Sequence, residues 1–242
     1  MFAKCLLLLL LLAASRGVAA SDMPDEAVEQ AQRALLGDAK TLLLEDGDVE
    51  PALVILDGML EHYAALYPQG ETRWYVARNQ SETLANLVRA AAQHDRGVPG
   101  PPSSRVIQAS WGDALYYKGY ALIEQGRLAE AKLSLQEAIS LSPYNSMYHA
   151  QIGHIHQVGK DWDAALAAFR AAEDAVSFSP AAAQRHDSGR AKRGIAYCLI
   201  ELQRLDEARV KLEEALELDP EDARAAESLK YVRQLKARTT GG

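Results

Sequence analysis

Three stretches of this chain repeat one another closely enough to limit the folds open to it. Residues 127–143 read RLAEAKLSLQEAISLSP, and residues 204–220 read RLDEARVKLEEALELDP. Between them, residues 161–173 (DWDAALAAFRAAE) carry the same order of a small alanine, a large apolar residue four positions on and a second alanine three further on. These positions share one face of a helix, and the alanines let another helix approach closely. Such a helix cannot bury its face alone, so copies of it are expected to stack.

This pattern resembles the tetratricopeptide repeat, a helix-turn-helix unit of about 34 residues whose second helix carries Ala, a large residue and a closing Pro. Counting back from Ala131 places Gly119 at the small position of the first helix. The resemblance then gives three copies, over residues 112–145, 146–179 and about 189–222.

Two of the copies depart from the family pattern. In the second, Ser177 stands in the slot of the closing proline. In the third, Ala196 replaces the small glycine and Gln203 replaces the glycine of the turn. The step from Gly153 to Ala196 is also nine residues longer than a repeat of about 34 residues allows. We therefore expect the first helix of the third copy to be lengthened, to residues 180–203.

The resemblance implies an all-α fold, a right-handed superhelical stack of helix pairs of the tetratricopeptide type. The repeat domain would span residues 105–237 and end in a solvating helix over residues 221–237. Residues 238–242 read as a tail without structure. The apolar side of the solvating helix would be made by Ala226, Leu229, Val232 and Leu235.

Residues 21–95 read as an N-terminal helical region. Amphipathic patterns over residues 24–45 and 49–67 predict two helices, which fit either a degenerate repeat or a plain helical hairpin. Residues 71–95 are expected to form a third helix. Its buried side would be made by Trp74, Tyr75, Leu84, Leu87 and Val88.

The stretch RGVPGPPSS, residues 96–104, interrupts the helical pattern. Adjacent prolines and nearby glycines cannot continue a helix, so a linker is expected here. Ser103 or Ser104 would then cap a long helix that reaches Gln125.

Residues 1–20 have the pattern of a secretory signal peptide. Lys4 precedes an apolar run over residues 5–14, and Val18 and Ala20 are small residues at the two recognition positions of a cleavage site before Ser21. The run is shorter than the roughly 20 apolar residues of a membrane span. We therefore expect a periplasmic or secreted protein with no stable span; the rival interpretation is an uncleaved anchor.

Several classes of site are disfavoured by the sequence. The formal net charge of −7 argues against a nucleic-acid binder, which would carry a positive footprint. The chain lacks H-E-x-x-H, G-x-S-x-G and G-x-G-x-x-G motifs. His154 and His156 would point about 200° apart on a helix, so they cannot chelate one ion. We predict no cofactor, no metal and no enzymatic activity, and Cys198 is expected in the core.

The remaining candidate for a functional site is the groove lined by the first helices of the repeats. In the family, repeat positions 2, 5, 9, 12 and 13 of the first helices line a concave groove. Tyr116 and Tyr120 stand where heat-shock co-chaperones carry the Lys and Asn of a carboxylate clamp, so that ligand is not implied. The alternative is an ordinary solvated helix face. The predicted partner-binding residues are Tyr116, Tyr120, His154, Gln157, His186, Arg190, Arg193 and Tyr197.

The sequence therefore indicates a non-catalytic module that holds a peptide or helix of a partner protein in this groove. His186, Arg190 and Arg193 share one helix face and form a basic stripe, which favours a partner with acidic or carboxylate groups. The export signal joined to the repeats resembles bacterial envelope scaffolds that act in assembly or secretion. Two alternatives stay open: an oligomerisation module that uses the exposed ends of the stack, and an enzyme with an unrecognised site.

Overall fold

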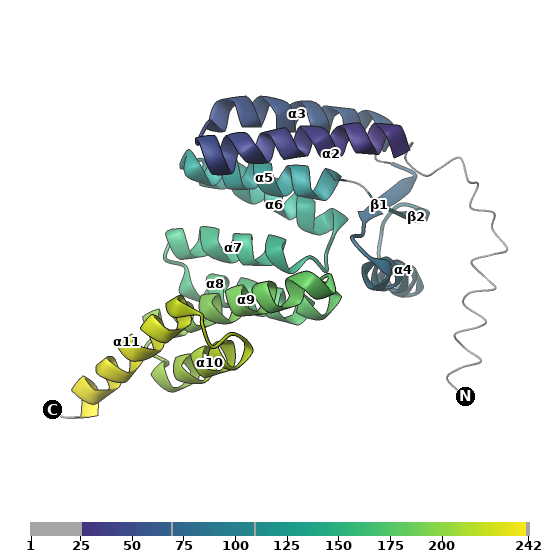
Figure 1. The fold of residues 1–242 in the computed structure, drawn as a ribbon. Coiled ribbons are helices and arrows are strands. Elements are labelled where there is room, and N and C mark those ends of the chain that lie inside the picture. The colour runs from purple at the N-terminus through teal and green to yellow at the C-terminus, as the bar shows by residue number, and fades with distance from the viewer. Residues whose placement is uncertain (1–25, 69, 109, 241–242) are drawn as a thin grey trace.

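The computed structural model describes residues 26–68, 70–108 and 110–240. Its helices form successive layers, from α2 (Glu26–Thr41) and α3 (Val49–Leu66) at one end to α11 (Ala223–Thr240) at the other (Figure 1). The elements between these ends are, in chain order, η2 (Leu42–Asp46), β1 (Thr72–Val76), α4 (Gln80–Asp95), β2 (Ser103–Ile107), α5 (Trp111–Glu124), α6 (Leu128–Leu141), α7 (Ser146–Val158), α8 (Trp162–Ala175), η3 (Val176–Phe178), α9 (Ala181–Glu201) and α10 (Leu205–Leu218).

The three repeats fold as the pairs α5/α6, α7/α8 and α9/α10. In each second helix the two alanines of the pattern are fully buried, and the large residue between them is at most 4% exposed. The small residue of the first helix makes room for it. A Cβ on Gly119 would lie 2.7 Å from Leu135, and one on Gly153 would lie 2.8 Å from Phe169. The expected helical stack is confirmed.

The N-terminal hairpin of α2 and α3 packs directly on α5. Glu29 of α2, only 4% exposed, fixes this contact. Its carboxylate accepts hydrogen bonds from Tyr63 Oη at 2.9 Å and from the backbone N and Oγ of Ser110, both at 2.8 Å. Ser110 is the residue before α5, so the carboxylate also lies at the positive end of that helix.

The prediction of a helix over residues 71–95 is wrong at its start. Residues 72–76 form β1, which pairs in parallel with β2, with Thr72 opposite Ser103. Only α4 is helical, beginning after Asn79, whose side chain accepts a hydrogen bond from the Glu82 backbone at 2.9 Å. A parallel pair needs a crossover connection, and α4 supplies it.

The predicted linker over residues 96–104 is wrong at its end, because the chain forms a strand there. Ser103 and Ser104 belong to β2 rather than to a helix cap, and α5 begins only at Trp111. Residues 72–107 thus form a βαβ insert between the hairpin and the first repeat.

The face of α4 that the sequence predicted as buried is open. Leu84, Leu87 and Val88 are 58%, 45% and 57% exposed, whereas Glu82 and Asn86 are buried. Glu82 turns inward because the guanidinium of Arg78 pairs with it and the Arg78 backbone N–H donates to it at 2.7 Å. Of the aromatic residues assigned to that face, Tyr75 is buried, but it lies on β1.

The insert also reaches the far half of the stack. Asn79 Nδ2 donates a hydrogen bond of 2.8 Å to the carbonyl of Phe178, in the turn between α8 and α9. The insert therefore lies along the edge of the stack at which α9 begins (Figure 1).

The lengthened first helix of the third repeat is present as α9, which has 21 residues. The helix α11 differs from the sequence expectation in two details. α11 continues to Thr240, through most of the stretch expected to be an unstructured tail. Its buried side holds Ala225 rather than Ala226, together with Leu229 and Val232. The signal peptide predicted for residues 1–20 lies outside the described residues. Within those residues, no helix combines the length and apolar character that crossing a bilayer requires.

Candidate functional site

A hollow of about 290 Å³ opens between α7, α9 and α11; we call it the Arg190 hollow. It brings together five of the eight residues predicted from the sequence. These are His154, Gln157, Arg190, Arg193 and Tyr197. The remaining lining comes from Ala150, Phe169, Gly194, Arg224 and Ser228.

Arg190 is held in place by two neutral side chains. Its guanidinium donates to Tyr116 Oη at 3.3 Å and to the Gln151 amide oxygen. Gln151 is buried on α7, so it cannot follow the arginine outward. Among the described residues no carboxylate pairs with Arg190. The positive charge is therefore positioned but not neutralised.

Arg193 differs from this, although it lies one helical turn further on. Its guanidinium pairs with Asp222, whose side chain is only 8% exposed. Asp222 also accepts a hydrogen bond of 3.1 Å from the backbone N–H of Ala225, at the start of α11. The basic stripe predicted from the sequence is thus partly neutralised within the molecule, and Arg193 ties α9 to α11.

Tyr116 continues the site toward α5. It is buried, and its ring stacks on Tyr148 with centroids 5.6 Å apart. Tyr148 Oη in turn donates to Asp113 at 2.7 Å. Burial raises the pKa of the Asp113 carboxyl, against the opposing effect of this hydrogen bond. Tyr120 is half-buried one turn further along α5 and does not line the Arg190 hollow.

Two predicted residues lie toward the outside. Tyr197 is 49% exposed, and its ring lies 5.9 Å from that of Trp162. His186 is exposed and lines a second hollow of about 520 Å³, which borders the first because both contain Arg193 and Arg224. Its Nδ1 lies 3.3 Å from the carboxylate of Asp187.

Arg224 and Ser228 were not predicted from the sequence, because α11 was expected only to cover the end of the stack. A signal for Arg224 was present. Arg224 follows Arg190 by one repeat length of 34 residues, and Tyr231 follows Tyr197 by the same distance. The helix α11 thus repeats two groove positions of α9.

Cys198 lies in the core beside this site. Burial raises the pKa of its thiol to about 11, so the thiol is protonated at neutral pH. Gln157 Nε2 lies 3.6 Å from its sulfur. No group of three or more histidine, cysteine or acidic side chains within residues 26–68, 70–108 and 110–240 is arranged to hold a metal ion.

Two family models, both described as tetratricopeptide repeat, match residues 112–145 and 194–222. The chain contains tetratricopeptide repeats. The first match coincides with the pair α5/α6 and the second with most of α9/α10. Proteins with this fold are generally non-catalytic binding scaffolds, which agrees with the prediction that this chain has no enzymatic activity.

No curated protein sequence matches this chain. Among solved structures, MamA from Desulfovibrio magneticus RS-1 (residue 41 to the end) is 17% identical, with a TM-score of 0.53 over 85% of each chain. At this identity the likeness shows a shared fold alone. The second repeat domain of human RPAP3, solved with an HSP70 peptide, is 16% identical, with a TM-score of 0.43 over 50% of this chain and 98% of that one.

Proposed function

We propose that this protein binds a peptide segment of a partner protein in the Arg190 hollow, with a carboxylate of the partner placed against Arg190. The proposal rests on the fixed orientation and the unneutralised positive charge of the Arg190 guanidinium. Tyr116 and Gln151 orient this group, and neither neutralises it. An oriented guanidinium can hold a carboxylate through two parallel hydrogen bonds.

The surroundings of Arg190 support a peptide rather than a small molecule. The hollow is shallow and continues into the His186 hollow, so a ligand can extend along α9. His154 and Tyr197 are exposed at its side. Tyrosine and arginine are enriched among the residues that dominate binding energies in protein interfaces. Arg224 adds a second cation from α11.

Replacing Arg190 with alanine is expected to weaken binding of an acidic peptide by about 1.5–3 kcal/mol, the range for hydrogen bonds to charged groups. The probe is a fluorescein-labelled peptide rich in Asp and Glu, compared with the same peptide carrying Asn and Gln. Fluorescence anisotropy should show tighter binding of the acidic peptide, and its affinity should fall as salt is added.

Arg170→Ala is the matched control. Arg170 is an exposed arginine on α8 and does not line the hollow, so its removal changes the net charge equally. Equal losses for Arg170→Ala and Arg190→Ala would reduce the effect to net charge. Equal affinity of the acidic and amide peptides would contradict the proposal that Arg190 binds a carboxylate of the partner.

We further propose that the protein is exported and acts as a scaffold in bacterial envelope assembly or secretion. The support is the signal-peptide pattern of residues 1–20. N-terminal sequencing of the cellular protein is expected to give Ser21 as the first residue. A protein that begins at Met1 in the cytosol would contradict export while leaving the groove proposal intact.

A further inference from the structure

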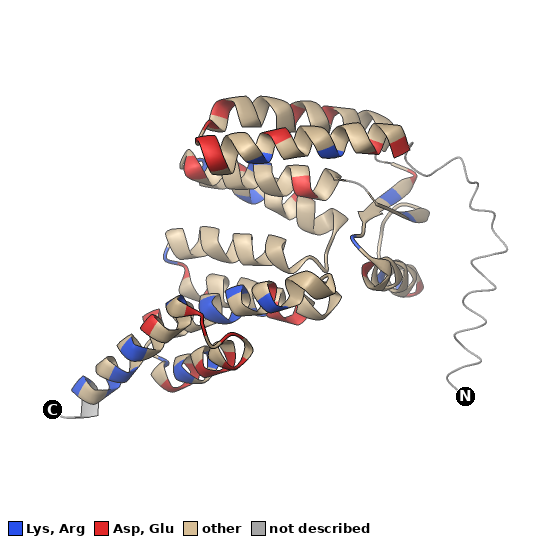
Figure 2. Cartoon of the chain, in the orientation of Figure 1, with Lys and Arg blue, Asp and Glu red and all other residues tan. Residues whose placement is uncertain are grey.

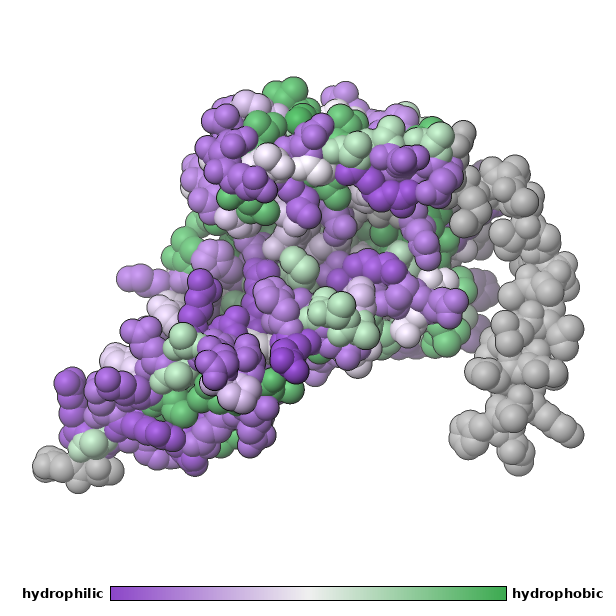
Figure 3. All heavy atoms as spheres, in the orientation of Figure 1, coloured by the Kyte–Doolittle hydropathy of each residue, from purple (hydrophilic) through white to green (hydrophobic). Residues whose placement is uncertain are grey.

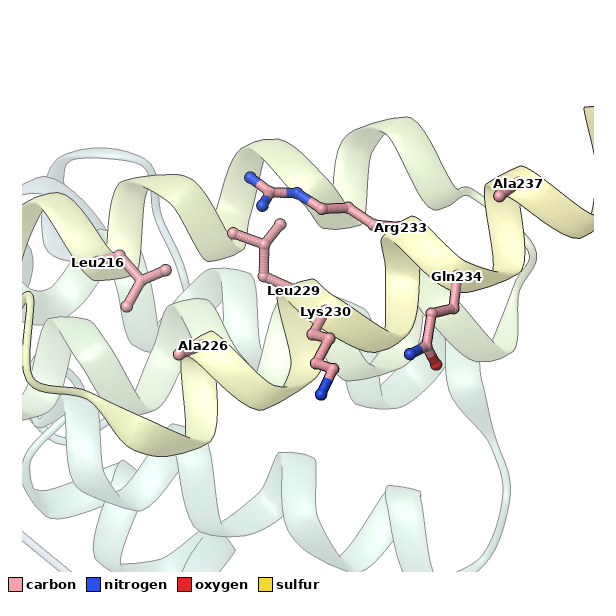
Figure 4. A pocket seen from close by; sticks show the side chains of 7 residues that line it. All are labelled: Leu216, Ala226, Leu229, Lys230, Arg233, Gln234 and Ala237. Atoms are coloured by element: carbon pink, nitrogen blue, oxygen red, sulfur yellow. The ribbon is translucent and has the colours of Figure 1, made fainter.

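The C-terminal end of the stack carries an apolar hollow of about 620 Å³ between α10 and α11, which we call the tail hollow. Its apolar lining comes from Leu216 of α10 and from Ala226 and Leu229 of α11. The rest of the lining comes from Lys230, Arg233, Gln234 and Ala237 of α11. Figure 4 shows Arg233 extending over Leu229 and Lys230 pointing away from it.

The internal repeat shows what this face of α11 is built from. One repeat length of 34 residues before Leu229, Lys230 and Arg233 stand Ile195, Ala196 and Leu199 of α9. Those three residues are at most 1% exposed, since α9 is packed between α8 and α10. In the described chain no helix follows α11, so Lys230 and Arg233 at the equivalent positions are exposed, while Leu229 is 6% exposed at the base of the hollow. This side of α11 is a packing face with two of its three positions changed to cations.

The lining of the tail hollow holds two cations, Lys230 and Arg233, and no carboxylate, although on α10 Glu213 lies 3.8 Å from Arg233 and Asp206 pairs with Lys236. The opposite end of the stack is acidic. Residues 26–66, which span α2 and α3, contain nine carboxylates against two Lys or Arg residues, and α11 contains five Lys or Arg residues against one Glu. Eight of those nine carboxylates are exposed. Figure 2 shows the acidic residues on the N-terminal hairpin and the basic residues along α11, at opposite ends of the molecule.

The outer side of that hairpin can also come close to another helix. Val54 is 72% exposed, and Gly58 and Ala65 follow it at helical spacing on the same exposed side of α3. A Cβ on Gly58 would meet nothing within 4 Å, so this side is open. Figure 3 shows apolar residues in the open over the hairpin. We call the exposed side of α2 and α3 the head face.

We propose that the tail hollow receives the head face of a second copy of this chain. Opposite charges favour the contact of head with tail, whereas head with head and tail with tail bring like charges together. Such a contact joins two different surfaces, so it continues from copy to copy unless the rotation closes a ring. The inference concerns the ends of the stack and is independent of the Arg190 hollow.

The test is sedimentation velocity of the purified full chain over a range of concentrations, at about 0.05 M and about 0.5 M NaCl. The average mass is expected to rise with concentration beyond that of a dimer at low salt and to fall at high salt. Lys230→Glu changes the tail only, and Gly58→Gln fills the head face only. Each should weaken self-association at least about tenfold, while Arg170→Glu on α8 should not.

Mixing the two variants separates this contact from a symmetric one. Lys230→Glu retains an intact head face and Gly58→Gln retains an intact tail hollow, so an equimolar mixture should form dimers that neither variant forms alone. Gln is a better helix former than Gly, and Gly58 is exposed, so Gly58→Gln should melt no lower than the wild-type chain. A chain that stays monomeric, variants that associate as the wild type does, or a mixture without dimers would each overturn the proposal. A monomer whose tail hollow binds a separate acidic helix overturns it as well.

Discussion

Replacing Phe169 with alanine is expected to lower the free energy of unfolding by about 3–5 kcal/mol, the usual cost of removing a buried phenylalanine ring. Phe169 is 4% exposed and fills the space left by two glycines on different helices. A Cβ on Gly153 would lie 2.8 Å from its ring, and one on Gly194 would overlap it. The ring therefore joins the second repeat to the third. Denaturant-induced unfolding measures the loss.

A double-mutant cycle with Gly194 makes this prediction specific. Gly194→Ala should destabilise the wild-type chain, because its new methyl group overlaps the Phe169 ring. In the Phe169→Ala background the same methyl group enters the cavity, so Gly194→Ala should restore stability. Leu133→Ala is the control, since Leu133 is 66% exposed and should change stability by less than about 0.5 kcal/mol. Equal effects of Gly194→Ala in both backgrounds would show that the ring does not fill this space.

Replacing Glu29 with alanine is expected to cost about 2–5 kcal/mol, because buried donors left without an acceptor cost about 1–3 kcal/mol each. Tyr63 Oη and the backbone N–H of Ser110 would both lose their partner. Burial is the largest cause that raises the pKa of Tyr63, and the variant keeps it, so the hydroxyl stays protonated at neutral pH and remains a donor without an acceptor. Chemical denaturation gives the size of the effect.

Hydrogen exchange would show where the loss acts. Amides of α2 and of the first turn of α5 should lose protection, since Glu29 joins these two helices. Glu26→Ala, on the same helix with a side chain 85% exposed, should leave both the stability and the exchange unchanged. If Glu29→Ala behaved as Glu26→Ala does, the buried carboxylate would not hold the hairpin on α5.

The repeats could be predicted from the sequence because their packing depends on residue size at fixed spacing. Ala131, Leu135 and Ala138 must be small, large and small for α6 to pack against α5, and this requirement leaves a visible pattern. The nine extra residues before Ala196 likewise had a direct consequence, since a longer first helix absorbs them without disturbing the stack.

The packing of the βαβ insert could not be predicted from hydrophobic periodicity, because the side chains that α4 buries are polar. Leu84, Leu87 and Val88 have helical spacing, which assigned them to the core. The structure instead buries Glu82, because the charge of Arg78 compensates it. A charged side chain that is buried because one charged partner compensates it carries no hydrophobic periodicity.

Five of the residues that line the candidate site could be predicted from the sequence, but the pairing that neutralises one of its arginines could not. Repeat spacing placed Arg190 and Tyr197 on one side of α9, and both line the same hollow. The pairing of Arg193 with Asp222 depends on how the turn before α11 folds back on α9, which no local pattern reveals. Arg224 required only that the 34-residue register be carried one copy further.

The hydrogen bond from Asn79 to the Phe178 carbonyl joins residues 99 positions apart and bears on how the stack comes undone. Arrays in which each unit touches only its neighbours lose structure gradually from their ends. Here the insert at the N-terminal side supports the turn between α8 and α9, in the middle of the array. Fraying of the first layers therefore also loosens that central turn. Local openings at the two places are coupled, and the array unfolds more nearly as one cooperative unit than its repeats alone would imply.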